Sequence, residues 1–185
     1  RKDKAPMDQR VIGRVLVANR GEIAVRVLRA CRELGIEGVA VYSDADENSL
    51  HVRVASLATR IGPAPAEESY LSIGAIIDAA RRTGADAVHP GYGFLAENPA
   101  FADAVAGAGL TFVGPPARVM EVTGSKIASR AIMAKAGIPV VPGEAPGEQS
   151  AEALAATAAR VGYPVLVKAS AGGGGRGMRV VRHPE

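Results

Sequence analysis

A run of glycines near the end of the sequence is the strongest candidate for binding chemistry. The segment 172–177 reads Gly-Gly-Gly-Gly-Arg-Gly and follows a short apolar segment, 164–169, that predicts a strand. The run satisfies the Gly-x-Gly-x-x-Gly pattern of dinucleotide-binding turns. That pattern opens a helix, however, whereas the residues that follow, Met178-Arg-Val-Val181, are β-like. The sequence therefore predicts a strand, a glycine loop and a second strand.

Such a loop can close over phosphate groups, because backbone without Cβ atoms approaches closely and consecutive N–H groups form an anion nest. The nest would comprise Gly172, Gly173, Gly174 and Gly175. Lys168, at the end of the preceding strand, would bring an ammonium to the same phosphates, as the lysine and glycine loop of protein kinases do. The alternative is a plain hairpin with a solvated lysine. The glycines together with Lys168 favour a nucleotide.

A second lysine, Lys126, follows Thr123-Gly-Ser125 at the expected start of a helix. Free N–H groups at a helix start favour an anion, so Lys126 is a candidate second phosphate ligand. Lysines at helix starts are also common on protein surfaces. Position alone leaves both interpretations open.

The segment His89-Pro-Gly-Tyr-Gly-Phe-Leu-Ala-Glu-Asn98 follows a predicted strand at 86–89. Open α/β sheets bind ligands at the carboxyl ends of their strands, so this loop is placed to present Tyr92, Glu97 or Asn98 to a crevice. A structural turn with His89 as a satisfied polar group is the alternative. No paired histidines, Cys-x-x-Cys or carboxylate cluster with metal-ligand spacing occurs in these segments.

Alternating strand and helix patterns must position these residues. Strands are expected at 14–18, 38–42, 56–61, 86–89 and 111–114, and helices at 23–34, 47–55, 71–82 and 99–107. Asn19 with Glu22 resembles a capping box, Gly35 is a suitable C′ stop, and Pro99 suits a first helical turn. Five alternations predict an α/β fold with a doubly wound, mostly parallel sheet.

The pattern changes after Pro115-Pro116. Helices are expected at 117–122 and 125–136, a loop at 142–149, and a helix capped by Ser150 and stopped by Gly162. We expect one domain at 12–115, a helical linker at 116–141 and the beginning of a second, small α+β domain at 142–185.

Composition and charge limit the classes of protein to which this chain can belong. Hydrophobic residues make up 48% and aromatic residues only 4%, which is typical of aliphatic, helix-covered sheets. The net charge is +3 and basic residues alternate with acidic ones, so nucleic-acid binding is not expected. There is no apolar run of membrane-spanning length, and the single cysteine, Cys31, lies at an apolar helical position. We expect a cytoplasmic protein, no membrane association and a buried, unreactive Cys31.

Four segments together resemble the biotin carboxylase family, and they occur in the family's order. They are Val17-Ala-Asn-Arg-Gly-Glu-Ile-Ala24, the segment 89–98, Thr123-Gly-Ser-Lys126, and Val167-Lys-Ala-Ser-Ala-Gly-Gly-Gly-Gly-Arg-Gly-Met178. The resemblance runs from about Ile12 to Arg182. It implies a pre-ATP-grasp (Rossmann-like) domain and the start of an ATP-grasp lid domain, as a fragment of a larger enzyme.

The resemblance also implies roles for individual residues. In the family, the lysines matching Lys126 and Lys168 contact nucleotide phosphates, the loop matching Gly172 to Gly175 folds over them, and the methionine matching Met178 lies nearby. Tyr92 matches a tyrosine close to the biotin site. The family's metal-binding glutamates and active-site arginine match positions beyond Glu185, so the fragment alone is expected to be inactive.

The implied reaction is ATP-driven carboxylation of biotin. Bicarbonate is activated as carboxyphosphate, and N1 of biotin on a carrier protein or domain is carboxylated, with Mg²⁺ accompanying ATP. The implied partners are the biotin carboxyl carrier, a carboxyltransferase subunit or domain and a second copy of the parent in a homodimer. The acceptor, such as acetyl-CoA for fatty acid biosynthesis or propionyl-CoA, is left open. The alternatives are another ATP-grasp ligase, such as a carbamoyl-phosphate synthetase, and a non-catalytic nucleotide-binding module.

Overall fold

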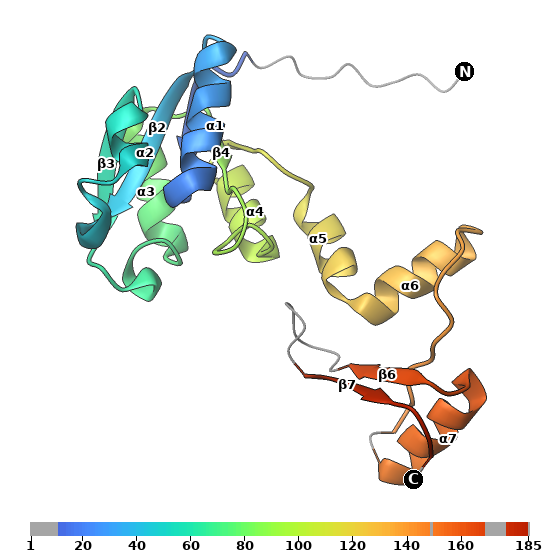
Figure 1. Cartoon of the computed structure of the whole chain (residues 1–185). Coiled ribbons are helices and arrows are strands. Elements are labelled where there is room, and N and C mark those ends of the chain that lie inside the picture. Colours follow the sequence, from blue (N-terminus) through green and yellow to red (C-terminus); the bar gives the residue numbers. More distant parts are fainter. Residues whose placement is uncertain (1–10, 149, 169–176, 185) are drawn as a thin grey trace, which may run out of the picture. The chain divides into compact units, whose positions relative to one another are not determined.

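The structure is a computed structural model that describes residues 11–148, 150–168 and 177–184 (Figure 1). The chain divides into two compact units, Arg1–Met120 and Glu121–Glu185. The division falls inside a helix, α5 (Ala117–Gly124). The domain bounds 12–115, 116–141 and 142–185 remain predictions of the sequence.

The first unit is built on a five-stranded parallel sheet in the order β3-β2-β1-β4-β5. The strands are β1 (Arg14–Val17), β2 (Glu37–Ser43), β3 (Leu57–Gly62), β4 (Ala87–His89) and β5 (Thr111–Phe112). The helices of this unit are α1 (Gly21–Glu33), α2 (Leu50–Val54), α3 (Ile73–Thr83) and α4 (Pro99–Gly107), with two 3₁₀ turns, η1 (Asp44–Asp46) and η2 (Ala66–Glu68). The predicted α/β class and parallel sheet are confirmed.

Helices pack on both faces of the sheet because successive side chains of a strand point to opposite faces. Leu16 of β1 lies in a core cluster with residues of α3 and α4, such as Ile76 and Phe101. Its neighbour Val17 lies in the other cluster, with Leu28 and Cys31 of α1. The predicted doubly wound arrangement follows from this alternation. Cys31 is buried, as expected, and burial raises the pKa of its thiol.

Local sequence signals correctly predicted several helix ends. Gly35 follows α1 with a φ of 71°, and Pro99 is the first residue of α4, whose N-cap is Asn98. The helix expected at 47–55 is shorter, at Leu50–Val54, because the residues before it form the 3₁₀ turn η1 and a bend.

The second unit contains the second half of α5, then α6 (Lys126–Lys135), α7 (Ala151–Val161), and an antiparallel hairpin of β6 (Val165–Lys168) and β7 (Met178–Val181). The Ser150 hydroxyl accepts a hydrogen bond from the Ala153 N–H at 3.2 Å, so the predicted N-cap of α7 is confirmed. The two strands expected before and after the glycines are also present, as β6 and β7, whereas residues 169–176 lie outside the described residues. Among the described residues, no helix is long and apolar enough to cross a membrane.

Candidate functional site

The candidate site lies where β1 and β4 end side by side. These strands are parallel neighbours, and Val17 pairs with His89. The chain leaves β1 through Asn19 and Arg20, and it leaves β4 into the loop that carries Tyr92. Parallel pairing brings residues about 70 positions apart in sequence to one edge of the sheet.

Asn19 fastens these two loops together. Its side-chain amide nitrogen donates hydrogen bonds to the carbonyl oxygens of Pro90 and Tyr92, each at 2.8 Å. Its Oδ1 accepts from the Arg20 N–H at 2.9 Å. The capping box expected from Asn19 and Glu22 is therefore wrong. Helix α1 starts at Gly21 with no side-chain cap, because the Asn19 amide is hydrogen-bonded to the loop after β4.

The polar residues of the loop at 89–98 divide into structural and exposed ones. His89 Nδ1 accepts a hydrogen bond from the Gly91 N–H at 3.0 Å, and burial lowers the pKa of His89. Asn98 Oδ1 accepts from the Ala100 N–H at 2.9 Å as the cap of α4. Both side chains thus accept hydrogen bonds from nearby backbone N–H groups and stabilise the local structure. Glu97 is exposed, and so is Tyr92, with 59% of its surface accessible.

A shallow pocket of about 380 Å³ lies beside Tyr92 and is lined by residues 19–23 and 92–94. It combines the end of β1, the first turn of α1 and the loop after β4. Its lining includes two aromatic residues, Tyr92 and Phe94, and the basic residue Arg20. Such a pocket suits a small, partly apolar group with polar edges.

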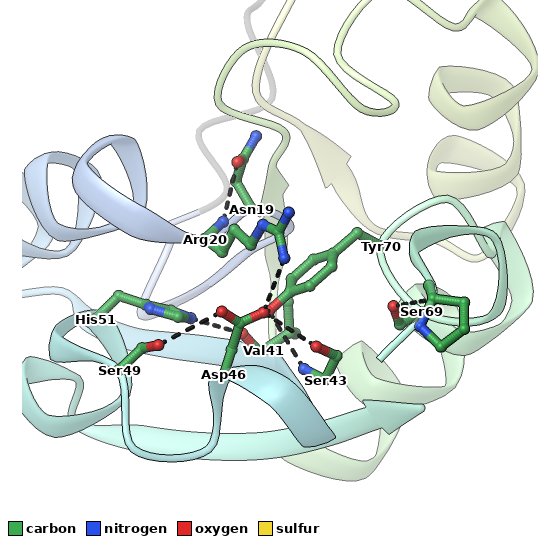
Figure 2. Close-up of polar contacts among 10 residues, drawn as sticks. Asn19, Arg20, Val41, Ser43, Asp46, Ser49, His51, Ser69 and Tyr70 are labelled. Carbon is green, nitrogen blue, oxygen red and sulfur yellow. Dashed lines mark hydrogen bonds and ion pairs between the residues drawn. The ribbon is translucent and has the colours of Figure 1, made fainter. Parts of the chain in front are cut away.

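Arg20 belongs to a hydrogen-bonded cluster that the sequence analysis missed (Figure 2). Its Nη1 lies 3.1 Å from Asp46 Oδ2, and the same oxygen accepts from the Tyr70 hydroxyl at 2.8 Å and the Ser43 hydroxyl at 3.0 Å. Burial alone would raise the pKa of Asp46, but hydrogen bonds from Tyr70, Arg20 and Ser43 hold it below its ordinary value. Asp46 is therefore a carboxylate fixed by several donors.

Tyr70 is fully buried, and burial raises the pKa of its hydroxyl well above the ordinary value. Its ring stacks on that of Phe94, with centroids 5.0 Å apart. His51, also fully buried, places Nε2 3.1 Å from the Val41 carbonyl oxygen, while its Nδ1 has no hydrogen-bond partner among the residues that the structure describes. Burial lowers the pKa of His51. No spacing pattern pointed to Asp46, Tyr70 or His51; the only signal was that Arg20 lies within the family-like segment 17–24.

The predicted phosphate ligands lie in the second unit. Lys168 ends β6 and pairs with Met178 at the start of β7, and both side chains are exposed. Lys126 is the first residue of α6, whose N-cap Ser125 accepts from the Ala128 N–H at 3.2 Å. The four glycines 172–175 lie outside the described residues. The hairpin thus brings Lys168 and Met178 together, and their roles remain predictions.

Two family models match the sequence. The N-terminal domain of biotin carboxylase matches residues 11–120. The ATP-binding domain of the carbamoyl-phosphate synthase L chain matches residues 125–185. Their common border lies near the division between the two units of the structure.

Curated relatives are similar over nearly the whole chain. Methylcrotonoyl-CoA carboxylase subunit alpha, mitochondrial, of Oryza sativa is 58% identical over 174 residues, which is 94% of this chain and 24% of that protein. Biotin carboxylase of Pseudomonas aeruginosa is 55% identical, covering 92% of this chain and 38% of that protein. The chain therefore spans between a quarter and two fifths of the length of these relatives.

Solved structures of biotin carboxylases are also similar to this chain. The biotin carboxylase domain of Hydrogenobacter thermophilus 2-oxoglutarate carboxylase, in complex with MgADP, ADP and bicarbonate, superposes with a TM-score of 0.88 at 48% identity. It covers 95% of this chain, and this chain covers 39% of it. Biotin carboxylase of Campylobacter jejuni, in a β-γ-ATP complex, gives 0.89 at 46% identity, over 94% of this chain and 39% of that one.

Proposed function

The chain belongs to the biotin carboxylase family, and on that premise we propose that it is part of an enzyme that carboxylates biotin with ATP and bicarbonate. The observation that carries the proposal is the similarity, over 95% of the chain, to a biotin carboxylase domain solved with MgADP and bicarbonate. The enzyme would be a ligase that cleaves ATP and joins the carboxyl group of bicarbonate to N1 of biotin.

The second unit would supply part of the nucleotide site. Lys168 is part of a regular strand, so its backbone position is well defined. In the sequence it lies shortly before the glycine run 172–175. Lys126 begins a helix, where unpaired N–H groups add to the attraction for an anion. A polyphosphate suits two lysines and a glycine loop, and Met178 offers an apolar side chain at the position paired with Lys168. We assign ATP to these residues.

Magnesium would accompany the nucleotide. In residues 11–148, 150–168 and 177–184, no three or more His, Cys, Asp or Glu side chains are grouped so that they could hold a metal ion. The proposal therefore assigns no metal ligand to these residues. When bound, the metal would neutralise phosphate charge.

The first unit would contribute to the acceptor site. Tyr92 and the pocket beside it form an exposed, partly aromatic surface that suits the bicyclic ring of biotin. Biotin would arrive on a carrier protein or domain, and a carboxyltransferase would consume carboxybiotin. We further propose a homodimeric, cytoplasmic parent that uses an acyl-CoA such as acetyl-CoA, in fatty acid biosynthesis, or propionyl-CoA.

A second candidate is a ligase of the carbamoyl-phosphate synthetase type, favoured by the match of residues 125–185 to that ATP-binding domain. The two candidates share the activation of bicarbonate by ATP and differ in the acceptor. The match of residues 11–120 to biotin carboxylase favours biotin.

The test uses the full-length parent with ATP and radioactive bicarbonate, and either free biotin or ammonia as the acceptor. The measurements are ADP release and acid-labile label fixed on each acceptor. Label on biotin supports the proposal, and label only in carbamoyl phosphate would replace it with the second candidate. ATP binding with no turnover on either acceptor would indicate a nucleotide-binding module.

A further inference from the structure

Phe94 occupies an unusual backbone position beside Tyr92. Its φ is 39°, the only positive φ of a non-glycine residue in the part of the chain that the structure describes. A side chain with a Cβ disfavours this region, so surrounding contacts must hold the residue there. Such positions are concentrated at binding sites. Phe94 lines the same pocket as Tyr92.

Two aromatic contacts hold Phe94. Its ring stacks on the buried ring of Tyr70, with an interplanar angle of 12°. The Arg20 guanidinium lies over both rings, with its Cζ 5.4 Å from the Phe94 centroid and 5.2 Å from the Tyr70 centroid. Arg20 is therefore shared between the fixed core and the loop after β4.

Arg20 is itself oriented by Asp46, which in turn is held by the Tyr70 and Ser43 hydroxyls. The Asp46 side chain is 17% exposed and that of Arg20 is 43% exposed. In Figure 2 the Arg20 side chain points toward the Tyr70 ring and Asp46. The carboxylate thus orients the Arg20 guanidinium, which in turn lies against Phe94 of the loop after β4.

We infer that Arg20 is a positioning residue: anchored by Asp46, it holds Phe94, and through it the Tyr92 loop, in the conformation that receives the acceptor. The inference rests on the proposed function, in which Tyr92 lies beside biotin. Arg20 would act on acceptor binding and leave the use of ATP unchanged, because among the described residues its side chain contacts Asp46 of η1, Tyr70 and Phe94 of the loop.

The chain offers a matched control. Arg60 forms a bidentate pair with Asp44, two residues before Asp46, at 2.6 and 2.8 Å. Both side chains of that pair are more than half exposed, and neither contributes to the pocket beside Tyr92. Arg60→Met therefore removes a similar ion pair without touching the loop.

The test compares Arg20→Met, Arg20→Lys, Asp46→Asn and Arg60→Met in the full-length parent. Arg20→Met should raise the KM for free biotin roughly tenfold, while the KM for ATP in the bicarbonate-dependent ATPase reaction stays within about twofold. Asp46→Asn should act in the same direction, and Arg20→Lys should lie between wild type and Arg20→Met, because an ammonium keeps the charge and loses the planar stack. Arg60→Met should match wild type.

A second measurement does not depend on turnover. The amides of Ala96 and Asn98 donate hydrogen bonds to the carbonyl oxygens of Gly93 and Leu95, so their hydrogen exchange reports on the loop. In the ligand-free parent it should be roughly tenfold faster in Arg20→Met than in Arg60→Met. If wild type fails to carboxylate biotin, the proposed function fails and the exchange rates alone decide the role of Arg20. The inference would be overturned if the exchange rates of Arg20→Met equalled those of Arg60→Met. It would also be overturned if Arg20→Met turned over normally with a KM for biotin within about twofold of the wild-type value. If Arg20→Met does not fold, Arg20→Lys and Asp46→Asn decide by the same two criteria.

Discussion

The Asn19 side-chain amide donates a 2.8 Å hydrogen bond to the Tyr92 carbonyl oxygen, across 73 positions of sequence. A second bond of the same length reaches Pro90. Because carbonyl oxygens can only accept, the amide nitrogen must face them. Asn19 is 3% exposed, so water cannot readily replace these bonds. The loop beside the candidate acceptor pocket is thus held from the end of the neighbouring strand.

Replacing this donor should destabilise the first unit. Asn19→Asp would turn an acceptor toward two carbonyl oxygens and should lower the free energy of unfolding by about 2–3 kcal/mol. The exposed Asn48 provides the control, because Asn48→Asp makes the same chemical change at the surface. Urea unfolding measures both variants. Equal midpoints would show that the Asn19 amide contributes little.

Gly91 and Gly93 form a matched pair for testing the close approach of backbone to Asn19. Their φ values are 66° and 67°, so alanine is strained equally at both. A Cβ at Gly91 would lie 2.8 Å from Asn19 Nδ2, whereas a Cβ at Gly93 would meet nothing within 4 Å. Gly93→Ala should cost about 1–2 kcal/mol and Gly91→Ala about 1–3 kcal/mol more, measured by urea unfolding. Equal costs would contradict the crowding at Gly91.

Stability should fall on mild acidification because of the buried His51 and the half-buried His89. The pKa values of His51 and His89 are lowered by burial, so the unfolded chain binds more protons than the folded one below the ordinary histidine pKa. Their contribution is complete above about pH 6.5 and is lost as the pH falls toward the folded values. The free energy of unfolding should therefore decrease from pH 7 to pH 5.

His51→Gln isolates one part of this effect, because glutamine keeps a donor for the Val41 carbonyl oxygen and does not titrate. The slope of unfolding free energy against pH should be smaller in His51→Gln than in wild type. A slope in His51→Gln that equals the wild-type slope would exclude His51 as a contributor.

Lys126 and Lys168 are predicted to contact nucleotide phosphates. Lys126→Met and Lys168→Met keep side-chain length and remove the charge, and each should lower ATP affinity or kcat/KM of the full-length parent by roughly ten- to hundredfold. Lys135, exposed at the end of α6, is the matched control. ATP binding and biotin carboxylation are the measurements. If Lys135→Met behaves like the other two, neither lysine is a phosphate ligand.

Much of the secondary structure followed from the sequence because its signals are local. Apolar spacing placed α1 and α3, Gly35 and Gly162 marked helix ends, and Pro99 marked a helix start. The order of strand, glycine run and strand in the sequence argues against a Rossmann turn, which opens a helix. The family-like segments also led to biotin carboxylase, which the comparisons confirm. These inferences need only neighbours along the chain.

Tertiary structure decided which polar side chains meet. Asn19 carried a local cap signal, yet parallel pairing of β1 with β4 presents it with two carbonyl oxygens of a distant loop. Asp46 lies 26 positions from Arg20 and 24 from Tyr70, and no periodicity connects them. They meet because β2 pairs with β1, and the turn after β2 therefore lies beside the start of α1. Burial then makes each of these hydrogen bonds important for stability, because a buried polar group must find its partner within the fold.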